Sequence, residues 1–152
     1  MMSRFIDITN RQQLNESLQS LKEDTVPLWG KMKSQQMIEH LIGDVEYTNG
    51  KKIFICELPA EEADRNKQKW IYTDVEIPKN LVLGPLPDVY RFASLEAATG
   101  QLLKELDDFD THFKTPGTTA DQLAYGPMDD KEWQIWHGKH FTHHFKQFGL
   151  ID

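Results

Sequence analysis

The sequence is short of three things: cysteine, long apolar runs and positive charge. Its single cysteine, Cys56, cannot form an internal disulfide, which is typical of a reducing compartment. Apolar runs stay below the roughly 18 residues that a membrane-spanning helix needs. Charge at Arg4 and Asp7 interrupts the apolar stretch that a signal peptide would require. We therefore expect a cytoplasmic protein without membrane segments.

The shortage of positive charge also limits the partners. Lysine and arginine number 17 against 24 aspartates and glutamates, so the formal net charge is −7. A chain of this sign repels phosphate backbones and anionic bilayers. Nucleic acids and membrane surfaces are therefore poor partners, and we expect a small-molecule substrate. A homodimer is compatible with the sequence but does not follow from it.

The length sets the number of domains. The chain has 152 residues, which is enough for one domain. A compact chain of this size buries about 69% of its unfolded surface, so a core forms without disulfides. The sequence shows no internal repeat and no low-complexity tract. We expect a single domain over residues 1–152.

Four segments have apolar residues at helical spacing, over residues 10–21, 34–50, 94–115 and 129–149. Capping residues open them: an Asn-x-x-Gln box at Asn10, Ser34, Ser94, and an Asp-x-x-Glu box at Asp129. Glycines or a Pro-Gly pair close three of them. Four such helices predict an all-α fold, a four-helix bundle packed around one apolar core.

The connection between the second and third expected helices is long and irregular. Residues 51–91 contain several prolines and no clear helical periodicity. Within them, Lys69–Val75 is compatible with a short strand or with extended chain. An insert of this length usually serves as a lid, a pocket wall or an interface. We expect it to form a wall of the substrate pocket.

Histidines gather on the face that the last expected helix buries. His140 and His144 are one turn apart, so two imidazoles can reach one ion. His40 lies at the shoulder of the apolar stripe of the second helix, and Asp44 shares its side. The three histidines would form a three-nitrogen site with an open position for water or substrate, the pattern of catalytic metals. Asp44 is better placed than Glu39 to orient a ligand.

The alternative is that these histidines are ordinary core residues, as most single histidines on apolar faces are. Three histidines in one buried arc are harder to explain as core residues, because each buried imidazole without a hydrogen-bond partner lowers the stability of the fold by about 1–3 kcal/mol. A divalent metal would satisfy all three, and imidazoles suit Zn, Ni, Fe or Cu alike. A haem is disfavoured, because ligands one turn apart cannot reach opposite haem faces and no Cys-x-x-Cys-His motif is present.

Two motifs resemble those of the DinB/YfiT-like metalloenzyme superfamily: Met-Ile-Glu-His-Leu at Met37–Leu41 and His-Phe-Thr-His-His-Phe-Lys-Gln-Phe-Gly at His140–Gly149. The chain is most similar to a branch whose last helix carries His-x-x-His-His-x-x-Gln-Phe-Gly after a Glu-Trp pair, here Glu132-Trp133. Pro78-Lys79-Asn80 also fits the linker of that branch. The resemblance covers residues 34–149.

The resemblance implies a four-helix bundle that binds a divalent metal through one histidine of the second helix and two of the fourth. Carried over by position, these are His40, His140 and His144. The branch often has His-Pro-x-Phe-Gly before its last helix, whereas this chain has Leu123–Pro127, without that histidine. His137 lies outside the family pattern. It either forms a hydrogen bond to one of the metal ligands or simply packs in the core.

Other candidate residues have simpler explanations. The tryptophans are expected to pack, with Trp133 the best candidate for a pocket residue because it shares the histidine arc. Cys56 has no neighbouring Cys or His motif and is expected to be inert. Acidic residues at Asp107, Asp108 and Asp110 are expected to form a solvated run. Nucleophile and phosphate-loop motifs are absent from the sequence.

Two functions remain. In the first, a divalent metal (Zn, Ni or Fe) activates water or a low-molecular-weight thiol, as in a hydrolase or a thiol S-transferase. Superfamily relatives include thiol-dependent S-transferases and isomerases. In the second, the metal only stabilises a non-catalytic bundle that acts as a binding or dimerisation module. The absence of a clear general base beside the histidines keeps the second function open.

Overall fold

A computed structural model describes residues 4–79 and 86–152 of the chain. Over these residues the elements are α1 (Arg11–Leu18), α2 (Ser34–Glu46), α3 (Ala60–Trp70), α4 (Leu95–His112), β1 (Ala120–Gln122), β2 (Gly126–Met128) and α5 (Asp130–Gln147). The chain is mostly helical, in agreement with the predicted all-α class. No helix in the described part of the chain is long and apolar enough to cross a membrane.

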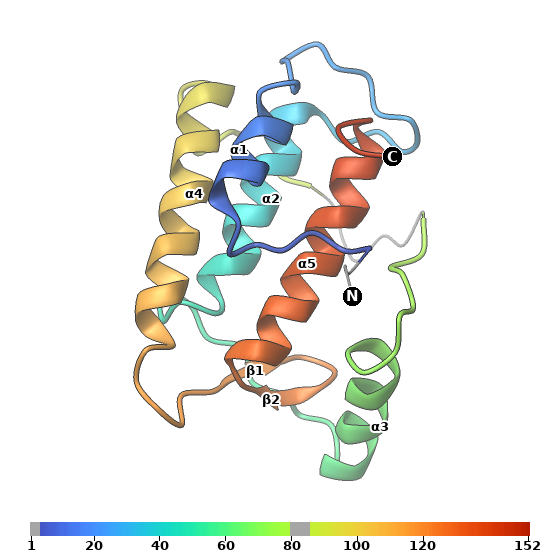
Figure 1. Cartoon of the computed structure of the whole chain (residues 1–152), viewed down its shortest axis with the longest axis vertical. Helices are drawn as coiled ribbons and strands as arrows, with labels where there is room; N and C mark the ends of the chain where they lie inside the picture. Colours follow the sequence, from blue (N-terminus) through green and yellow to red (C-terminus); the bar gives the residue numbers. More distant parts are fainter. Residues whose placement is uncertain (1–3, 80–85) are drawn as a thin grey trace.

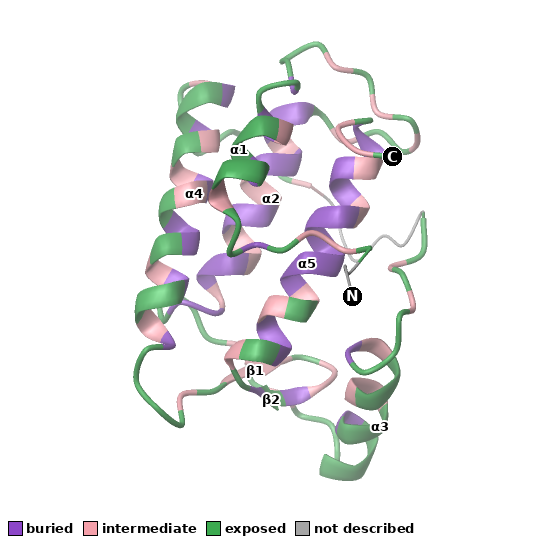
Figure 2. Ribbon diagram, viewed as in Figure 1, coloured by how far each residue is buried: buried purple, intermediate pink, exposed green. Residues whose placement is uncertain are grey.

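Helices α1, α2, α4 and α5 lie side by side along the long axis of the molecule, and α3 lies apart at one end, near the hairpin of β1 and β2 (Figure 1). The inward faces of these helices are buried and the outward faces exposed (Figure 2). Apolar side chains from all four helices form one core cluster, which includes Leu14, Met37, Leu106 and Phe145. Burying each such side chain stabilises the fold by about 1.5–3 kcal/mol. This core fixes α2 against α5, the two helices that carry the predicted ligands.

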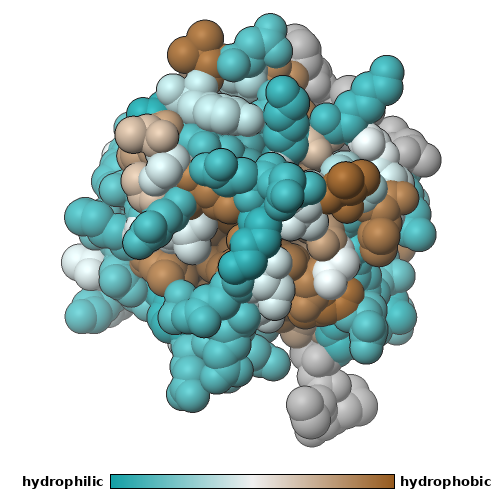
Figure 3. Space-filling view, turned by 90° about the horizontal axis from the view of Figure 1, so that it is seen from above, coloured by the Kyte–Doolittle hydropathy of each residue, from teal (hydrophilic) through white to brown (hydrophobic). Residues whose placement is uncertain are grey.

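The outer surface is mostly polar. Seen from the upper end of the molecule, hydrophilic side chains cover much of the face, with apolar patches between them (Figure 3). Two of the exposed apolar residues, Val26 and Leu28, belong to the loop between α1 and α2. Scattered exposed apolar residues of this kind are normal on soluble chains.

The structure confirms three of the four predicted caps. The Ser94 and Asp129 side chains accept hydrogen bonds from the backbone N–H groups of Ala97 and Glu132. Asn10 caps α1 through the N–H of Gln13. The prediction for Ser34 was wrong: it is the first residue of α2, and its hydroxyl donates to the Lys22 carbonyl at 2.6 Å.

The long connection is not wholly irregular, because it contains α3. This helix buries one residue, Ala63, so it has no apolar stripe from which periodicity could predict it. Its charges suit the helix dipole instead, with glutamates in the first turn and lysines in the last. The expected strand or extended chain at Lys69–Val75 is wrong at its start, where Lys69 and Trp70 end α3. Asn80, part of the predicted linker motif, lies outside the described residues.

The segment that follows α3 covers one side of α5. Lys139 of α5 lies under this segment and is 4% exposed. Its ammonium donates to the carbonyls of Trp70 and Thr73, both at 2.7 Å. The burial of Lys139 therefore depends on chain outside its own helix, which helical periodicity does not describe.

A buried carboxylate in the middle of α4 holds the turn that follows α2. Glu105 is 2% exposed and accepts hydrogen bonds from Asn49, Lys51 and Gln101. Asn49 and Lys51 lie in the turn after α2, so this one carboxylate ties that turn to α4. A buried carboxylate is tolerated only when it is paired in this way.

The N-terminal segment crosses α5 at a glycine. The N–H of Ile6 donates to the Thr142 hydroxyl at 2.8 Å, and that hydroxyl donates to the Gly138 carbonyl at 2.7 Å. A Cβ at position 138 would lie 2.5 Å from the Ile6 carbonyl oxygen. The close contact of the two backbones therefore depends on a glycine in the middle of a helix.

We predict that Gly138→Ala lowers the free energy of unfolding by about 1–3 kcal/mol, because the new methyl group displaces the N-terminal segment. Gly100→Ala is the matched control, since Gly100 lies within α4 with nothing within 4 Å of its added Cβ. Helix propensity alone makes that variant more stable by about 0.5–1 kcal/mol. Urea unfolding of the three proteins measures both effects, and equal stability of the two variants would contradict the contact.

Candidate metal centre

The three predicted ligands meet in the structure. The Nε2 atom of His140 lies 3.0 Å from Nε2 of His40 and 3.1 Å from Nε2 of His144. One ligand atom from each of the three lies within 4.8 Å of the others. Nitrogen ligands at 2.0–2.1 Å from a tetrahedral Zn²⁺ are about 3.3 Å apart. The two Nε2 spacings at His140 are therefore close to those around a single cation.

His144 is oriented by a glutamine one turn further along α5. The side-chain amide of Gln147 donates to the Trp29 carbonyl at 3.1 Å, which leaves its oxygen to accept from His144 Nδ1 at 2.8 Å. The proton of His144 is therefore assigned to Nδ1 from this network, and the lone pair to Nε2. That lone pair points to the place where the three rings converge.

Without a cation, the three rings cannot all be satisfied by one another. His140 Nε2 carries at most one proton, which it can donate to one neighbouring nitrogen but not to both. Its Nδ1 is buried and has no hydrogen-bond partner among the described residues. Buried polar atoms without partners cost about 1–3 kcal/mol each. A divalent cation at the centre would use all three lone pairs, so the residues present fit such a group.

Asp44 lies behind the ligands on α2. Its Oδ2 is 3.4 Å from His140 Nδ1 and 3.6 Å from His40 Nε2. Burial raises the pKa of the Asp44 carboxyl, and the charges of His40 and Lys52 oppose that rise. A small adjustment would let Asp44 accept the Nδ1 proton of His140, the usual role of a carboxylate behind a metal-bound histidine.

Burial also favours the neutral form of the two α5 imidazoles, His140 and His144. It lowers the pKa of His144 to about 3, and it lowers that of His140 well below the ordinary value, with further lowering by the neighbouring histidines. Both imidazoles are therefore neutral near pH 7. A neutral imidazole is the form that binds a metal.

The centre is open on the side of α2. The side chain of His40 is 32% exposed and that of Asp44 25%, whereas that of His140 is 8% exposed. On the opposite side, the ring of Trp136 packs on His140 with centroids 4.7 Å apart. Solvent therefore reaches the site along α2, while α5 forms its closed wall.

Part of the expected pocket wall lies elsewhere. Residues of the 51–91 connection and of the β1–β2 hairpin together line a hollow. The residues that line this hollow include Cys56, Ala63, Lys67, Asp121 and Tyr125. The three histidines are not among the described residues that line it. Cys56 itself is partly buried, and its backbone N–H donates to Asp121. We expected the connection to form a wall of the pocket at the metal centre, but the hollow that it lines lies away from the three histidines.

His137 is a packing residue. It is fully buried, and its ring stacks on that of Trp133 at 5.4 Å and meets that of Phe109 edge-on. The Thr48 hydroxyl donates to the Val45 carbonyl, so it accepts from His137 Nε2 at 2.9 Å. Trp133 also packs, and its indole donates to the Ala120 carbonyl. Neither residue reaches the centre of the three rings.

The acidic run forms ion pairs with neighbouring lysines and an arginine. Asp108 pairs with Lys51 and Lys104, and Arg11 lies close to Asp107 and Asp110. Asp107 is exposed and Asp108 partly so, and none of the three lies in the metal centre. The expectation of a surface carboxylate run is confirmed.

The functional residue that sequence reasoning did not assign is Gln147. It stands in the Gln-Phe-Gly end of the last motif, and its spacing of three residues from His144 was a usable signal. The link to Trp29, in contrast, joins residues 118 positions apart and has no local signal.

Comparison with protein-family models, with curated proteins and with solved structures finds no match to this chain. The family resemblance of the two histidine motifs therefore stays a prediction.

We predict that Gln147→Leu weakens metal binding about 10–100-fold, because His144 then loses the group that fixes its ring and its proton. Gln134→Leu is the matched control on α5, since Gln134 bonds only Asp130 at the helix start among the described residues. Isothermal titration of both variants with Zn²⁺ measures the difference. Equal affinities would remove Gln147 from the site.

We also predict that the metal-free protein loses stability as the pH falls below about 6.5. Burial lowers the pKa of His137 and of His144 to about 3 from 6.5, so the unfolded chain takes up these protons first. Each such histidine then lowers the free energy of unfolding by about 1.4 kcal/mol for every pH unit below the pKa it has in the unfolded chain. Urea midpoints between pH 7 and pH 5 test this.

His137→Gln provides the control, because glutamine retains a donor for Thr48 and does not titrate. This variant should lose stability less steeply with falling pH than the wild type. Parallel pH profiles for the two proteins would show that His137 does not contribute.

Proposed function

We propose that this protein is a metal-dependent enzyme that binds one divalent cation (Zn²⁺, Ni²⁺ or Fe²⁺) through His40, His140 and His144. A cation held there lowers the pKa of a bound water or thiol toward neutrality, which is the chemistry of a hydrolase or a thiol S-transferase. The observation that carries the proposal is the convergence of three Nε2 atoms from two helices, with 3.0 and 3.1 Å between neighbours.

The residues of the chain have distinct parts in this proposal. His140 and His144, fixed on α5, define the closed side of the centre, and Gln147 sets the proton of His144. His40 completes the set from α2 on the open side. Asp44 orients the ligands and is the nearest carboxylate that can accept a proton from a bound substrate. Three ligands leave a position for that substrate, as in catalytic zinc sites.

The proposal extends to fold and family. Helices α1, α2, α4 and α5 constitute a four-helix bundle of the DinB/YfiT-like type, to which α3 and the hairpin are additions. The side-by-side arrangement in Figure 1 and the shared core support this assignment. The ligand positions inferred from the family motifs coincide with the three rings that meet.

A non-catalytic role has one observation in its favour. Asp44 Oδ2 lies 3.6 Å from His40 Nε2, so a modest movement would bring it to the cation as a fourth ligand. A site closed in this way is typical of structural metals. The protein would then be a metal-stabilised helical module for binding or dimerisation.

We predict that His140→Ala abolishes stoichiometric metal uptake, because it removes the central nitrogen of the three. His143→Ala is the matched control, since the His143 ring packs edge-on against Trp29 and His144 but is not one of the three histidines that converge. Elemental analysis after dialysis against Zn²⁺ should give about one equivalent for the control and wild type. Equal uptake by His140→Ala would contradict the ligand set.

The cobalt-loaded protein separates the two functions. Its visible absorption reports the number and type of ligands. If the site is open, a small thiol added to the Co²⁺ form should produce a thiolate-to-cobalt charge-transfer band. A spectrum that does not respond to thiol in the wild type, but does so in Asp44→Ala, would favour the structural role.

A further inference from the structure

The open side of the metal centre has a gap in the side chains of α2. Gly43 lies within α2, one turn from His40 and next to Asp44. A glycine there costs about 0.5–1 kcal/mol of helix stability relative to alanine. Its φ is not in the left-handed region, and an added Cβ would meet nothing closer than Lys52 Nζ at 3.9 Å. Neither backbone conformation nor packing in the described structure requires a glycine.

Lys52 reaches over this gap. It follows the turn after α2 and folds back along the helix, so that its ammonium lies 5.3 Å from the ring centroid of Tyr47 and 3.3 Å from Glu46. Tyr47 stands one turn from Gly43 and two turns from His40.

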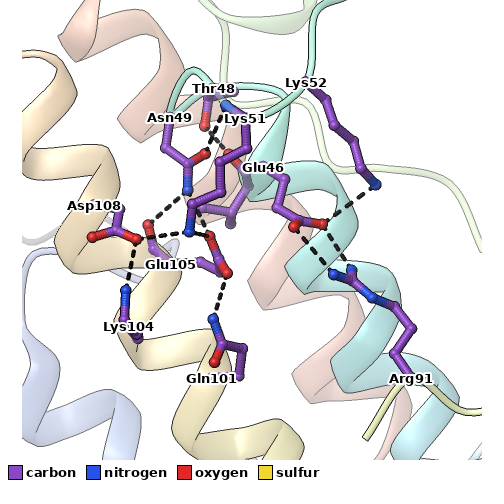
Figure 4. Close-up of polar contacts among 11 residues, drawn as sticks. Glu46, Thr48, Asn49, Lys51, Lys52, Arg91, Gln101, Lys104, Glu105 and Asp108 are labelled. Atoms are coloured by element: carbon purple, nitrogen blue, oxygen red, sulfur yellow. Dashed lines mark hydrogen bonds and ion pairs between the residues drawn. The ribbon is translucent and has the colours of Figure 1, made fainter.

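The charge of Lys52 is not fully neutralised. Arg91 already holds both oxygens of Glu46, at 2.7 and 3.2 Å (Figure 4). Lys52 approaches the same carboxylate from another side and is therefore a second cation on one anion (Figure 4). Arg91, Glu46 and Lys52 together carry one net positive charge, and the Asp44 carboxylate lies next to Gly43 on the same helix. The side chain of Lys52 is 43% exposed, so its ammonium is accessible to a ligand.

From this placement we infer that the substrate of the metal centre carries an anionic group, a carboxylate or a phosphate, which lies over Gly43 and binds Lys52. This inference rests on the proposed function. The missing side chain at position 43 gives the substrate room beside His40, and the ammonium binds its charge. A cation on the three histidines adds to the attraction, because both charges lie on the same side of α2.

Thiol binding to the cobalt-loaded protein tests the inference without an activity assay. The probes are 3-mercaptopropionate and 3-mercaptopropionamide, which have similar size but differ in charge. Charge-assisted hydrogen bonds are strong enough to change affinity about tenfold. The charge-transfer titration should therefore show about tenfold tighter binding of the carboxylate in the wild type. Lys52→Met should bring the ratio of the two affinities several-fold closer to one, because only the attraction of the cation then remains.

Two further variants control for general effects. Lys104→Met removes an exposed lysine that pairs with Asp108 on α4, and it should keep the wild-type ratio. Gly43→Leu should weaken binding of both thiols by a similar factor while metal uptake stays at one equivalent, because leucine favours helix and fills the gap. Competition with acetate and with inorganic phosphate then shows which anion the site prefers.

The outcomes are distinguishable. No cobalt uptake would overturn the proposed function and this inference with it. Normal cobalt uptake with equal affinity for the two thiols in the wild type would overturn only the inference. A wild-type preference that persists undiminished in Lys52→Met would overturn the role of Lys52, and unchanged thiol binding in Gly43→Leu would overturn the place assigned to the substrate.

Discussion

The burial of three imidazoles at one point is the constraint on which the account of this molecule depends. His140 and His144 lie on the closed side of α5, and His40 approaches them from α2 at 3.0 Å. Three neutral rings at this distance cannot satisfy one another by hydrogen bonds, and the Nδ1 of His140 is left without a partner among the residues described. A divalent cation would take up the lone pairs of the three facing nitrogens, and Asp44 Oδ2, 3.4 Å from the Nδ1 of His140, is the group placed to accept its proton. The arrangement is therefore easier to understand as a binding site than as part of an apolar core.

The surrounding structure holds the rings in place through contacts between distant parts of the chain. Gln147 connects His144 to the loop between α1 and α2, through the carbonyl of Trp29. Glu105 ties the turn after α2 to α4, and Arg91 holds Glu46 near the end of α2. These contacts fix the position of α2, and hence of His40, relative to α5. Lys52 belongs to the same region, so the framework of the centre and the charge beside it share one set of residues.

Much of the helical part of the fold could be predicted from sequence, because amphipathic spacing and capping residues are local. Ser94 and Asp129 mark helix starts by hydrogen bonds that span three residues. The meeting of the three histidines could be predicted for the same reason: His140 and His144 share a helix face, and His40 lies beside the apolar stripe of α2. The remainder depends on tertiary contacts. Helix α3 buries only Ala63, the hairpin strands have three residues each, and Lys139 is buried by chain that follows α3. None of these leaves a periodic pattern in the sequence.

X-ray absorption of protein that has been loaded with one equivalent of Zn²⁺ tests the central claim most directly. The account predicts a first shell of four light ligands, with three nitrogens at about 2.0–2.1 Å and the outer-shell scattering that imidazole rings produce. The His140→Ala protein should lose that pattern. A first shell of oxygens without imidazole scattering in the wild type, or the same spectrum in both proteins, would contradict the account.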